Sequence, residues 1–453
     1  MNGHKSKLKQ EVGLLGSFSL GFADVGAGIF LALGLIAAHA IGATPLAILV
    51  AAFVYLLTGI TYAELASAIP IAGGASVYGE RAFGKFFGFI GGWGLILDYT
   101  ICIALFAVAS AGYLSYFIPE IRNSFTLVTV SIIAILTAIN LFGIKESSRV
   151  NSILTVGTIA LIIILIGLGI TQFHYDKLSS VMKPIEQTPG IHSFLYSVTI
   201  AMVAFIGIES ISQGAEETVD PENTLPKAHI AAVVMVIVSA MLMSTIALGI
   251  VDPSVLSQNV DNSVIAFAMA LPFANILAPI VAFAGFAICL VSANTGVIGV
   301  SRVTYSMSNH EIVTSKFKWI HPKFCTPWVT IILFSAVAIF LAMYGDIFFL
   351  GELYAFGALT AYLIANLAVI KLRFDEPTRK RPFKIPINFR LNKIEIPIPA
   401  ILGSIGCFVM LCLVALLHEE GRNFAALWFI VGIAYYLGYA EYRKRKQHKQ
   451  NKN

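Results

Sequence analysis

The stretch FADVGAGIFLALG, residues 22–34, lies in the first long apolar segment of the chain and contains three glycines and an aspartate. A simple membrane helix favours larger apolar side chains here, because glycine weakens a helix and a buried carboxylate is costly. The stretch AFIGIESISQGAEE, residues 204–217, interrupts the sixth apolar segment in the same way. Two glycine-interrupted segments, five spans apart, predict broken helices that face each other at the midplane of a transporter. The alternative is that these glycines only allow close helix packing.

The composition places the whole chain in a membrane. Apolar residues make up 57% of the 453 residues and charged residues only 12%, and the mean hydropathy is +0.83. A soluble domain has roughly 25% charged residues. The length gives room for about twelve spans of ~20 residues, so we expect an all-α integral membrane protein. The apolar runs that predict these spans are residues 13–38, 43–67, 86–112, 125–142, 150–171, 191–215, 228–250, 276–306, 328–344, 350–370, 396–417 and 423–440.

The distribution of basic residues predicts the orientation of the chain. An even number of spans places both termini on one side, and the side richer in Lys and Arg is the cytoplasmic one. Of the 30 Lys and Arg residues, the predicted outer segments contain only Arg122, Lys177, Lys183 and Arg422. We therefore predict a multi-pass protein of the cytoplasmic membrane with both termini in the cytoplasm. The net charge of +5 then requires no nucleic-acid partner.

Two connectors between the spans are more apolar than ordinary loops. IPIAGGASVYGERAFGKF (69–86) lies on the predicted cytoplasmic side, and PSVLSQNVDNSVIAFAMALPFA (253–274) lies on the outer side. Such backbone is tolerated at membrane depth only when protein covers it or when it lines a water-filled cavity. We expect both connectors to pack against the helices and to gate a path.

Several motifs of the chain resemble those of the amino acid-polyamine-organocation (APC) superfamily of transporters. GAGIF (26–30) resembles the GSGIF-type substrate loop, and FIGIES (205–210) resembles the sixth-span FxGxE motif. EETVDPENTLPKA (216–228) looks like the EExxxPxxxxPxA connector, and IPIAGGASVY (69–78) looks like the connector after span two. The stretch 301–327 is similar to the exit of span eight. Beyond residue 330 the resemblance is mainly one of hydropathy.

This resemblance implies a LeuT-type fold, in which five spans are followed by five inverted spans and then by two peripheral helices. Residues 13–171 would form the first repeat and residues 191–370 the inverted repeat. Residues 396–440 would form the peripheral helices, and residues 441–453 a basic cytoplasmic tail.

The resemblance also implies a substrate site between the two interrupted segments. Backbone N–H groups of residues 27–29 would hold a substrate carboxylate, and carbonyls of residues 23–24 and 204–205 would hold its amino group. Phe205 or a neighbour would close the outer side, and Glu209 would act in gating or proton sensing. The implied substrate-binding residues are Asp24, Gly26, Ala27, Gly28, Ile29, Ala204, Phe205 and Gly207.

The chain departs from the superfamily pattern at two positions. Proton-coupled relatives often carry a Lys in span five, where this chain has Thr158. Thr158, together with Ser292 of span eight, would suit sodium equally well, so the coupling ion is either a proton or sodium. The arginine/agmatine antiporters place a Trp in span six where this chain has Val203. A guanidinium substrate is therefore not expected.

Two acids lie at membrane depth. Asp24 directly precedes the GAGI stretch, and Asp98 lies about twelve residues into span three, next to Tyr99. A carboxylate at the bilayer centre costs about 2.5–3.5 kcal/mol or more, so each must face the interior and be protonated or paired. No Lys or Arg lies at comparable depth in any predicted span. The partner is then a proton, an inorganic cation or the amine of a substrate, or the acid is protonated and only structural.

Two functions follow from these acids. The first is an amino acid or amine permease, in which Asp24 binds the ammonium and the GAGI amides bind the carboxylate. The second is a potassium or other monovalent-cation symporter, because the KUP-type importers of the same superfamily also carry an Asp before the first-span break. The GAGI anion loop favours the first. No protease or esterase motif lies at membrane depth, and the cysteines show no metal spacing, so we expect no enzyme, cofactor or metal site. The sequence does not predict the oligomeric state.

Overall fold

The computed structural model describes residues 10–143, 148–182, 190–344, 346–391 and 394–450, and most of them are helical. Lys183 and the two chain ends lie outside these ranges. The helices of the first half are α1 (Leu14–Ala40), α2 (Thr44–Ala68), α3 (Ala75–Phe83), α4 (Lys85–Leu114), α5 (Phe125–Leu141), α6 (Ser148–Thr171) and α7 (Tyr175–Met182). Those of the second half are α8 (Gly190–Ile200), α9 (Glu209–Gln213), α10 (Pro221–Leu248), α11 (Pro253–Gln258), α12 (Ser263–Met269), α13 (Ala274–Asn309), α14 (Trp328–Tyr344), α15 (Ile347–Asp375), α16 (Ile398–Leu417) and α17 (Glu419–Gln450).

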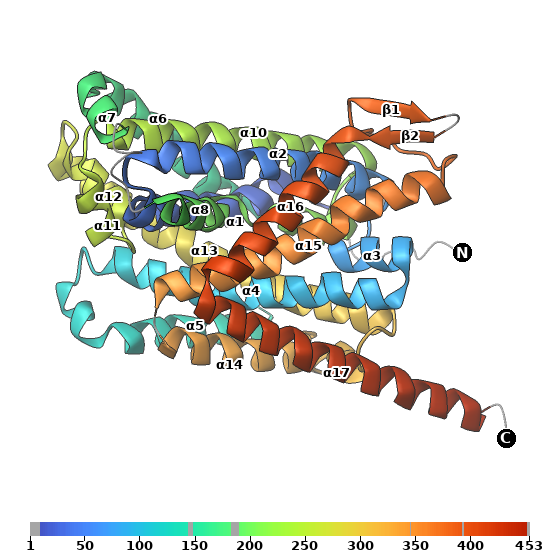
Figure 1. The fold of residues 1–453 in the computed structure, drawn as a ribbon. Helices are drawn as coiled ribbons and strands as arrows, with labels where there is room; N and C mark the ends of the chain where they lie inside the picture. Colours follow the sequence, from blue (N-terminus) through green and yellow to red (C-terminus); the bar gives the residue numbers. More distant parts are fainter. Residues whose placement is uncertain (1–9, 144–147, 183–189, 345, 392–393, 451–453) are drawn as a thin grey trace.

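The described residues contain ten helical segments that are long and apolar enough to cross a membrane. The first of them, Leu14–Ala68, is 55 residues long and contains both α1 and α2. The apolar stretch of α4 is completely buried within the protein. Both termini, α3 and the strands lie at one end of the bundle, whereas α7, α11 and α12 lie at the other (Figure 1). The expectation of a multi-pass helical membrane protein is confirmed.

The interruption expected in the sixth apolar segment is confirmed. After α8 the chain forms a short 3-10 turn, η4 (Ala201–Phe205), and Ile206 is extended, with φ −93° and ψ 141°. Gly207 has a φ of +126°, which side-chain-bearing residues rarely adopt. The glycine therefore lets the chain leave one helix and enter α9 at Glu209.

The interruption expected in the first segment is wrong, because α1 is helical from Leu14 to Ala40 without a break. A glycine in a helix costs about 1 kcal/mol relative to alanine, which weakens a helix but does not end it. The neighbours explain why glycine is needed. A Cβ atom on Gly28 would lie 2.4 Å from the carbonyl oxygen of Val203, and one on Gly26 would lie 2.9 Å from the ring of Phe22. Close packing, the alternative explanation for these glycines, therefore holds in α1.

Two segments expected to be loops have regular structure. Strands β1 (Asn388–Leu391) and β2 (Ile394–Pro397) form an antiparallel hairpin, with Asn388 opposite Pro397, so the chain is not entirely α-helical. The motif at 216–228 contains the start of α10, which begins at Pro221. Proline is favoured at this position because its fixed φ suits a helix and its missing N–H would be unpaired there anyway.

The two apolar connectors pack on opposite ends of the bundle. The first contains α3, where Gly73 N–H donates to Gln213 Oε1 (3.0 Å) and the Tyr78 hydroxyl donates to Ser212 Oγ (3.4 Å). The second contains α11 and α12, where Ser263 Oγ accepts a hydrogen bond from the Gly34 N–H of α1 (3.1 Å). The expected packing against the helices is confirmed, and gating by these connectors stays a prediction.

A buried ion cluster fastens α2 to α15 at the end of the bundle that holds the termini. Glu64 is completely buried, and its Oε1 accepts a hydrogen bond from Arg373 Nε (2.9 Å) and pairs with Arg381 Nε (3.2 Å). Its Oε2 accepts a further hydrogen bond from the Ile385 N–H (2.8 Å). Donors from three residues therefore compensate the desolvation of this one carboxylate, which anchors the segment leading to the hairpin.

We expect Glu64→Gln to destabilise the protein by about 3–5 kcal/mol, because the change leaves two arginines in the interior without their anion. The measurement is the melting temperature of the purified protein in detergent. Glu222→Gln is the matched control, since Glu222 pairs with the exposed Lys380 and should matter little. Equal melting temperatures for the two variants would show that the cluster does not anchor α2 to α15.

Candidate functional site

The candidate site lies where α1 contacts the interrupted segment between α8 and α9. A Cβ atom on Gly28 would meet the Val203 carbonyl oxygen at 2.4 Å and the Cα of Ala204 at 3.1 Å. A Cβ atom on Gly207 would lie 2.8 Å from the Cβ of Asp24. The two glycine-containing stretches singled out in the sequence are thus in backbone-to-backbone contact. One of them is broken and the other is a continuous helix.

Asp24 is completely buried and accepts hydrogen bonds from three different helices. Ser210 of α9 donates to its Oδ2 (2.6 Å), and Ser292 of α13 donates to its Oδ1 (2.8 Å). The thiol of Cys102 in α4 is a weaker donor to Oδ1 (3.5 Å). All three donors are neutral, and no Lys, Arg or His of the described residues forms an ion pair with Asp24. The carboxyl group is therefore hydrogen-bonded by neutral donors, and no basic side chain of the described residues pairs with it.

Asp98 of α4 lies beside Glu209 of α9. Both side chains are completely buried, and neither oxygen of Asp98 nor Glu209 Oε1 has a hydrogen-bond partner among the described residues. Glu209 Oε2 accepts a hydrogen bond from the Tyr362 hydroxyl of α15 (2.8 Å). The next residues along each helix also meet, since the Tyr99 hydroxyl lies 3.4 Å from Ser210 Oγ. Three of the residues predicted for gating or coupling are thus brought together, and Ser292 joins them through Asp24.

Phe205 lies at the interruption and is held between two tyrosines. Its ring stacks on Tyr55 of α2, with centroids 5.2 Å apart, and its backbone carbonyl lies 3.4 Å from the Tyr362 hydroxyl. The sequence assigned Phe205 to the outer closure of the site. The ring is completely buried, and its role in closing the outer side of the site stays a prediction.

The other predicted site residues are buried nearby, but the contacts that they make with the site differ. Ala27 and Ile29 are buried in α1, and their amides belong to a continuous helix, so these amides are not free to bind a carboxylate in this conformation. Ala204 contacts α1 at Gly28. Thr158 is buried in α6, which packs on α1, but no hydrogen bond among the described residues joins Thr158 to Asp24 or Ser292.

Three residues of the site were not predicted from the sequence. Cys102 follows Asp98 by one helical turn, so the i, i+4 spacing alone places both on one face of α4. Ser210 adjoins Glu209, and an adjacent hydroxyl is a weak signal because serine is common in membrane helices. Tyr362 lies far away in the sequence and carries no motif. Only the packing of α15 against α9 reveals it.

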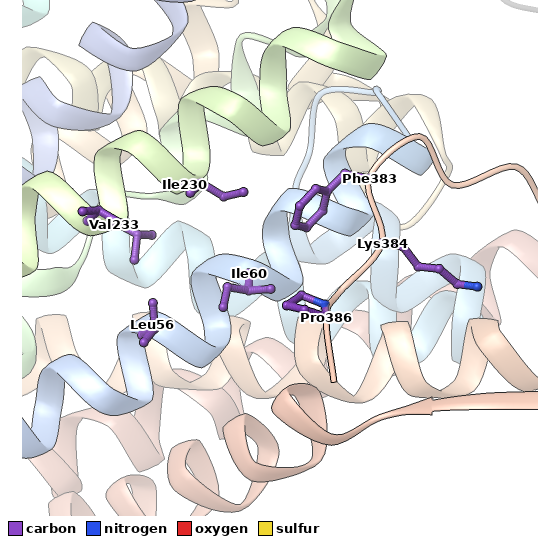
Figure 2. A pocket seen from close by; sticks show the side chains of 8 residues that line it. Leu56, Ile60, Ile230, Val233, Phe383, Lys384 and Pro386 are labelled. Atoms are coloured by element: carbon purple, nitrogen blue, oxygen red, sulfur yellow. The ribbon is translucent and has the colours of Figure 1, made fainter. Parts of the chain in front are cut away.

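The cavities show that the site is closed in this conformation. A cavity of about 10 Å³, enough for roughly one water molecule, touches Ile29 and Ala204. A larger one, of about 310 Å³, lies between α2, α10 and the segment before the hairpin (Figure 2). Its one charged lining residue, Lys384, is paired with Glu395, so it suits apolar groups rather than a polar solute. It is lined by Leu56, Ile60, Ile230, Val233, Val234, Phe383, Lys384 and Pro386.

A bundle of apolar helices with buried carboxyl groups beside a broken helix defines a membrane transporter. The sequence comparison refines this class. The model of the amino acid permease family matches residues 12–437, and the chain belongs to this family of the APC superfamily. Its members named below are transporters and not enzymes, in agreement with the resemblance found in the motifs.

Three relatives illustrate the range of solutes. The chain is 27% identical to the branched-chain amino acid permease BcaP of Bacillus subtilis, over 99% of this chain and 96% of the relative. It is 30% identical to the methylthioribose transporter of the same organism, over 84% of this chain and 86% of the relative. It is 25% identical to the low-affinity putrescine importer PlaP of Escherichia coli, over 90% of this chain and 88% of the relative.

We expect Gly28→Leu to abolish transport while the protein remains folded in the membrane, because the new side chain forces α1 away from the Val203 carbonyl. The measurement is solute uptake at matched expression, with size-exclusion chromatography to confirm folding. Gly157→Leu is the control, since a Cβ atom there meets nothing within 4 Å. Uptake close to that of the wild type in Gly28→Leu would show that the close approach of α1 is not needed for transport.

Proposed function

We propose that this permease is a secondary active transporter that moves amino acids or related amines across the cytoplasmic membrane by alternating access. The observation that carries the proposal is Asp24, a fully buried carboxylate held by neutral donors and without a basic partner among the described residues. A primary ammonium group is a natural partner for such a carboxylate, because a charge-assisted hydrogen bond offsets the cost of desolvating both groups.

The names of two relatives support an amine-containing solute. One relative is named for branched-chain amino acids and another for putrescine, and both kinds of solute carry an ammonium group at neutral pH. The third is named for methylthioribose, which has no amine. The family therefore also moves uncharged solutes, so the charge of Asp24 has to be tested directly.

We further propose that the chain crosses the membrane twelve times, as two inverted repeats of five spans (13–171 and 191–370) and two peripheral helices (396–440), with both termini in the cytoplasm. The position of the two termini at one end of the bundle supports an even number of crossings (Figure 1). The scarcity of Lys and Arg in the predicted outer segments supports the orientation. Residues 441–450, the start of the basic tail, continue α17 as a helix.

An amino acid also has a carboxylate, which needs a binding site of its own. The proposed carboxylate site is formed by the backbone amides of residues 27–29, but α1 must unwind locally to release them. Gly26 and Gly28 lower the cost of unwinding, because each glycine weakens the helix by about 1 kcal/mol relative to alanine. A diamine would not require this step, since it has no carboxylate.

The second candidate function is transport of a monovalent cation such as potassium. The observation that favours it is the set of oxygen atoms around Asp24: Ser292 Oγ lies 2.8 Å from Oδ1 and 3.5 Å from the Asp24 backbone carbonyl, and Ser210 Oγ lies 2.6 Å from Oδ2. Carboxylate, hydroxyl and carbonyl oxygens are the ligands that hard cations prefer. The same atoms would hold sodium if sodium were the coupling ion.

We expect Asp24→Asn to separate these two functions. If Asp24 binds an ammonium, the amide keeps an acceptor but loses the charge, so the affinity for leucine or putrescine should fall roughly ten- to a hundredfold. If Asp24 instead binds a bare cation, neutralisation should abolish concentrative uptake of rubidium altogether. The measurement is uptake of labelled leucine, putrescine and rubidium into proteoliposomes against imposed ion gradients.

The control for this experiment is Asp176→Asn, which neutralises an exposed acid of α7 at the other end of the bundle from the termini. It should transport like the wild type. Unchanged affinity for the amine solutes in Asp24→Asn would rule out the ammonium role. Rubidium accumulation by the wild type without any flux of leucine or putrescine would replace the proposed function by the second candidate.

A further inference from the structure

The groove between α2 and α10 lies apart from Asp24 and from the interrupted segment. It has a volume of about 310 Å³ and is closed at one end by Phe383 and Pro386 (Figure 2). Its inner wall contains the buried Val233, whereas Val234 at its mouth is 51% exposed. An apolar cavity of about 150 Å³ is enough to bind benzene. The groove is therefore large enough to hold part of an apolar chain.

The groove opens toward the acyl chains of the membrane. Both α2 and α10 belong to helical segments that are long and apolar enough to cross a bilayer. The start of α10 lies at the end of the bundle that holds the termini, since the Val219 N–H donates to the Val12 carbonyl (2.9 Å). At 1.5 Å per residue, Ile230 and Val234 lie about 14 and 20 Å from Pro221 along α10. This depth is that of acyl chains below one membrane surface.

A lysine without an acidic partner lies on the same stripe of α10 as the groove. Lys227 precedes Ile230 by three residues and Val234 by seven, so the three side chains share one face of the helix. Lys227 is exposed, and no acid among the described residues forms an ion pair with it. Side chains of a helix lean toward its N-terminus, so the Lys227 ammonium is directed from the groove toward the membrane surface.

A second lysine lies on the other side of the groove. The aliphatic part of Lys384 lines the groove, and its ammonium points away from the apolar walls (Figure 2). Lys384 pairs with Glu395, but Glu395 also pairs with the exposed Arg390, so Lys384 can turn to an external anion without leaving Glu395 unpaired. The surrounding segment, residues 377–386, contains four basic residues and no acid. Basic clusters at the membrane surface attract anionic lipid headgroups.

We propose that the groove binds one anionic phospholipid of the surrounding membrane. Part of an acyl chain lies in the groove against Leu56, Ile60 and Val234, and the ammonium groups of Lys227 and Lys384 hold the headgroup phosphate. Burial of methylene groups supplies affinity, whereas the two positive charges select an anionic headgroup over a neutral one. This site is separate from the solute site and does not depend on which solute is transported.

The bound lipid would stabilise the packing of α2 on α10 beside the interrupted segment. A Cβ atom on Gly59 of α2 would collide with Val233 of α10 and lie 3.1 Å from Ile208, directly before α9. The inner wall of the groove is therefore in contact with the residue at which α9 begins. A ligand that binds only the folded protein raises its melting temperature, so the anionic lipid should do so.

The experiment uses the full-length protein, freed of lipid in a neutral detergent. Dioleoyl phosphatidylglycerol is added, bound lipid is counted by native mass spectrometry, and the melting temperature is measured. We expect one tightly bound phosphatidylglycerol and a higher melting temperature. Phosphatidylcholine with the same chains should bind roughly fivefold more weakly or worse, because it has no net charge. Glycerol 3-phosphate should have no effect, because it has no acyl chain.

Two variants test the two halves of the site. Lys227→Gln should lower the affinity for phosphatidylglycerol roughly fivefold and leave that for phosphatidylcholine unchanged. Val234→Trp fills the groove and should lower both affinities roughly tenfold or more. The controls are Lys444→Gln, which removes an exposed lysine of α17, and Val238→Trp, which changes an exposed valine one turn further along α10 and outside the groove. Size-exclusion chromatography checks that all four are folded.

Selective loss of phosphatidylglycerol in Lys227→Gln and Val234→Trp, with wild-type binding in the controls, supports the inference. Equal binding by Val234→Trp and Val238→Trp overturns it, and so do equal wild-type affinities for the two lipids. Stabilisation by glycerol 3-phosphate alone would assign the lysines to a free phosphate and also overturns it. A wild-type dimer that only Val234→Trp dissociates would show that a second copy of the chain covers the groove instead.

Discussion

A carboxylate that is fully buried in a membrane protein must be surrounded by donors or neutralised. At Asp24 the donors come from α4, α9 and α13, so one buried charge holds four helices in a defined arrangement. This arrangement depends on Gly207, because any side chain there would collide with Asp24. The break before α9 thus brings α9 up against α1 and at the same time aims Ser210 at the carboxylate.

The buried acids fall into two kinds of environment, and the difference between them is physical. Asp24 accepts hydrogen bonds from three neutral donors on three helices. Neither oxygen of Asp98 has a hydrogen-bond partner among the described residues, whereas Glu209 Oε2 accepts a hydrogen bond from the Tyr362 hydroxyl. The first environment suits a cationic ligand.

Alternating access needs some contacts to open while others hold. Partly exposed ion pairs, Arg81 with Glu376 and Arg122 with Asp261, hold the connectors to other segments, and neutral hydrogen bonds of 3.0–3.4 Å hold them to α1 and α9. Such bonds contribute only about 0.5–1.5 kcal/mol each, because water replaces them easily. The Glu64 cluster is different, since separating a buried ion pair costs about 3–5 kcal/mol.

The sequence by itself determined the membrane class, the approximate limits of the apolar helices and the break in the sixth segment, because hydropathy and the φ of Gly207 are local properties. It also placed Asp24 and Asp98 at membrane depth and Glu209 beside the break in the sixth segment. Only the tertiary structure decided that α1 stays continuous at Gly26 and Gly28. Gly26 makes room for the ring of Phe22, and Gly28 makes room for the distant backbone of Val203, so neither glycine interrupts the helix. The donors Ser210, Cys102 and Tyr362, and the proximity of Asp98 to Glu209, likewise depend on how α4, α9 and α15 pack together. No periodicity within one helix specifies such contacts, because each of them joins residues that are distant in the chain.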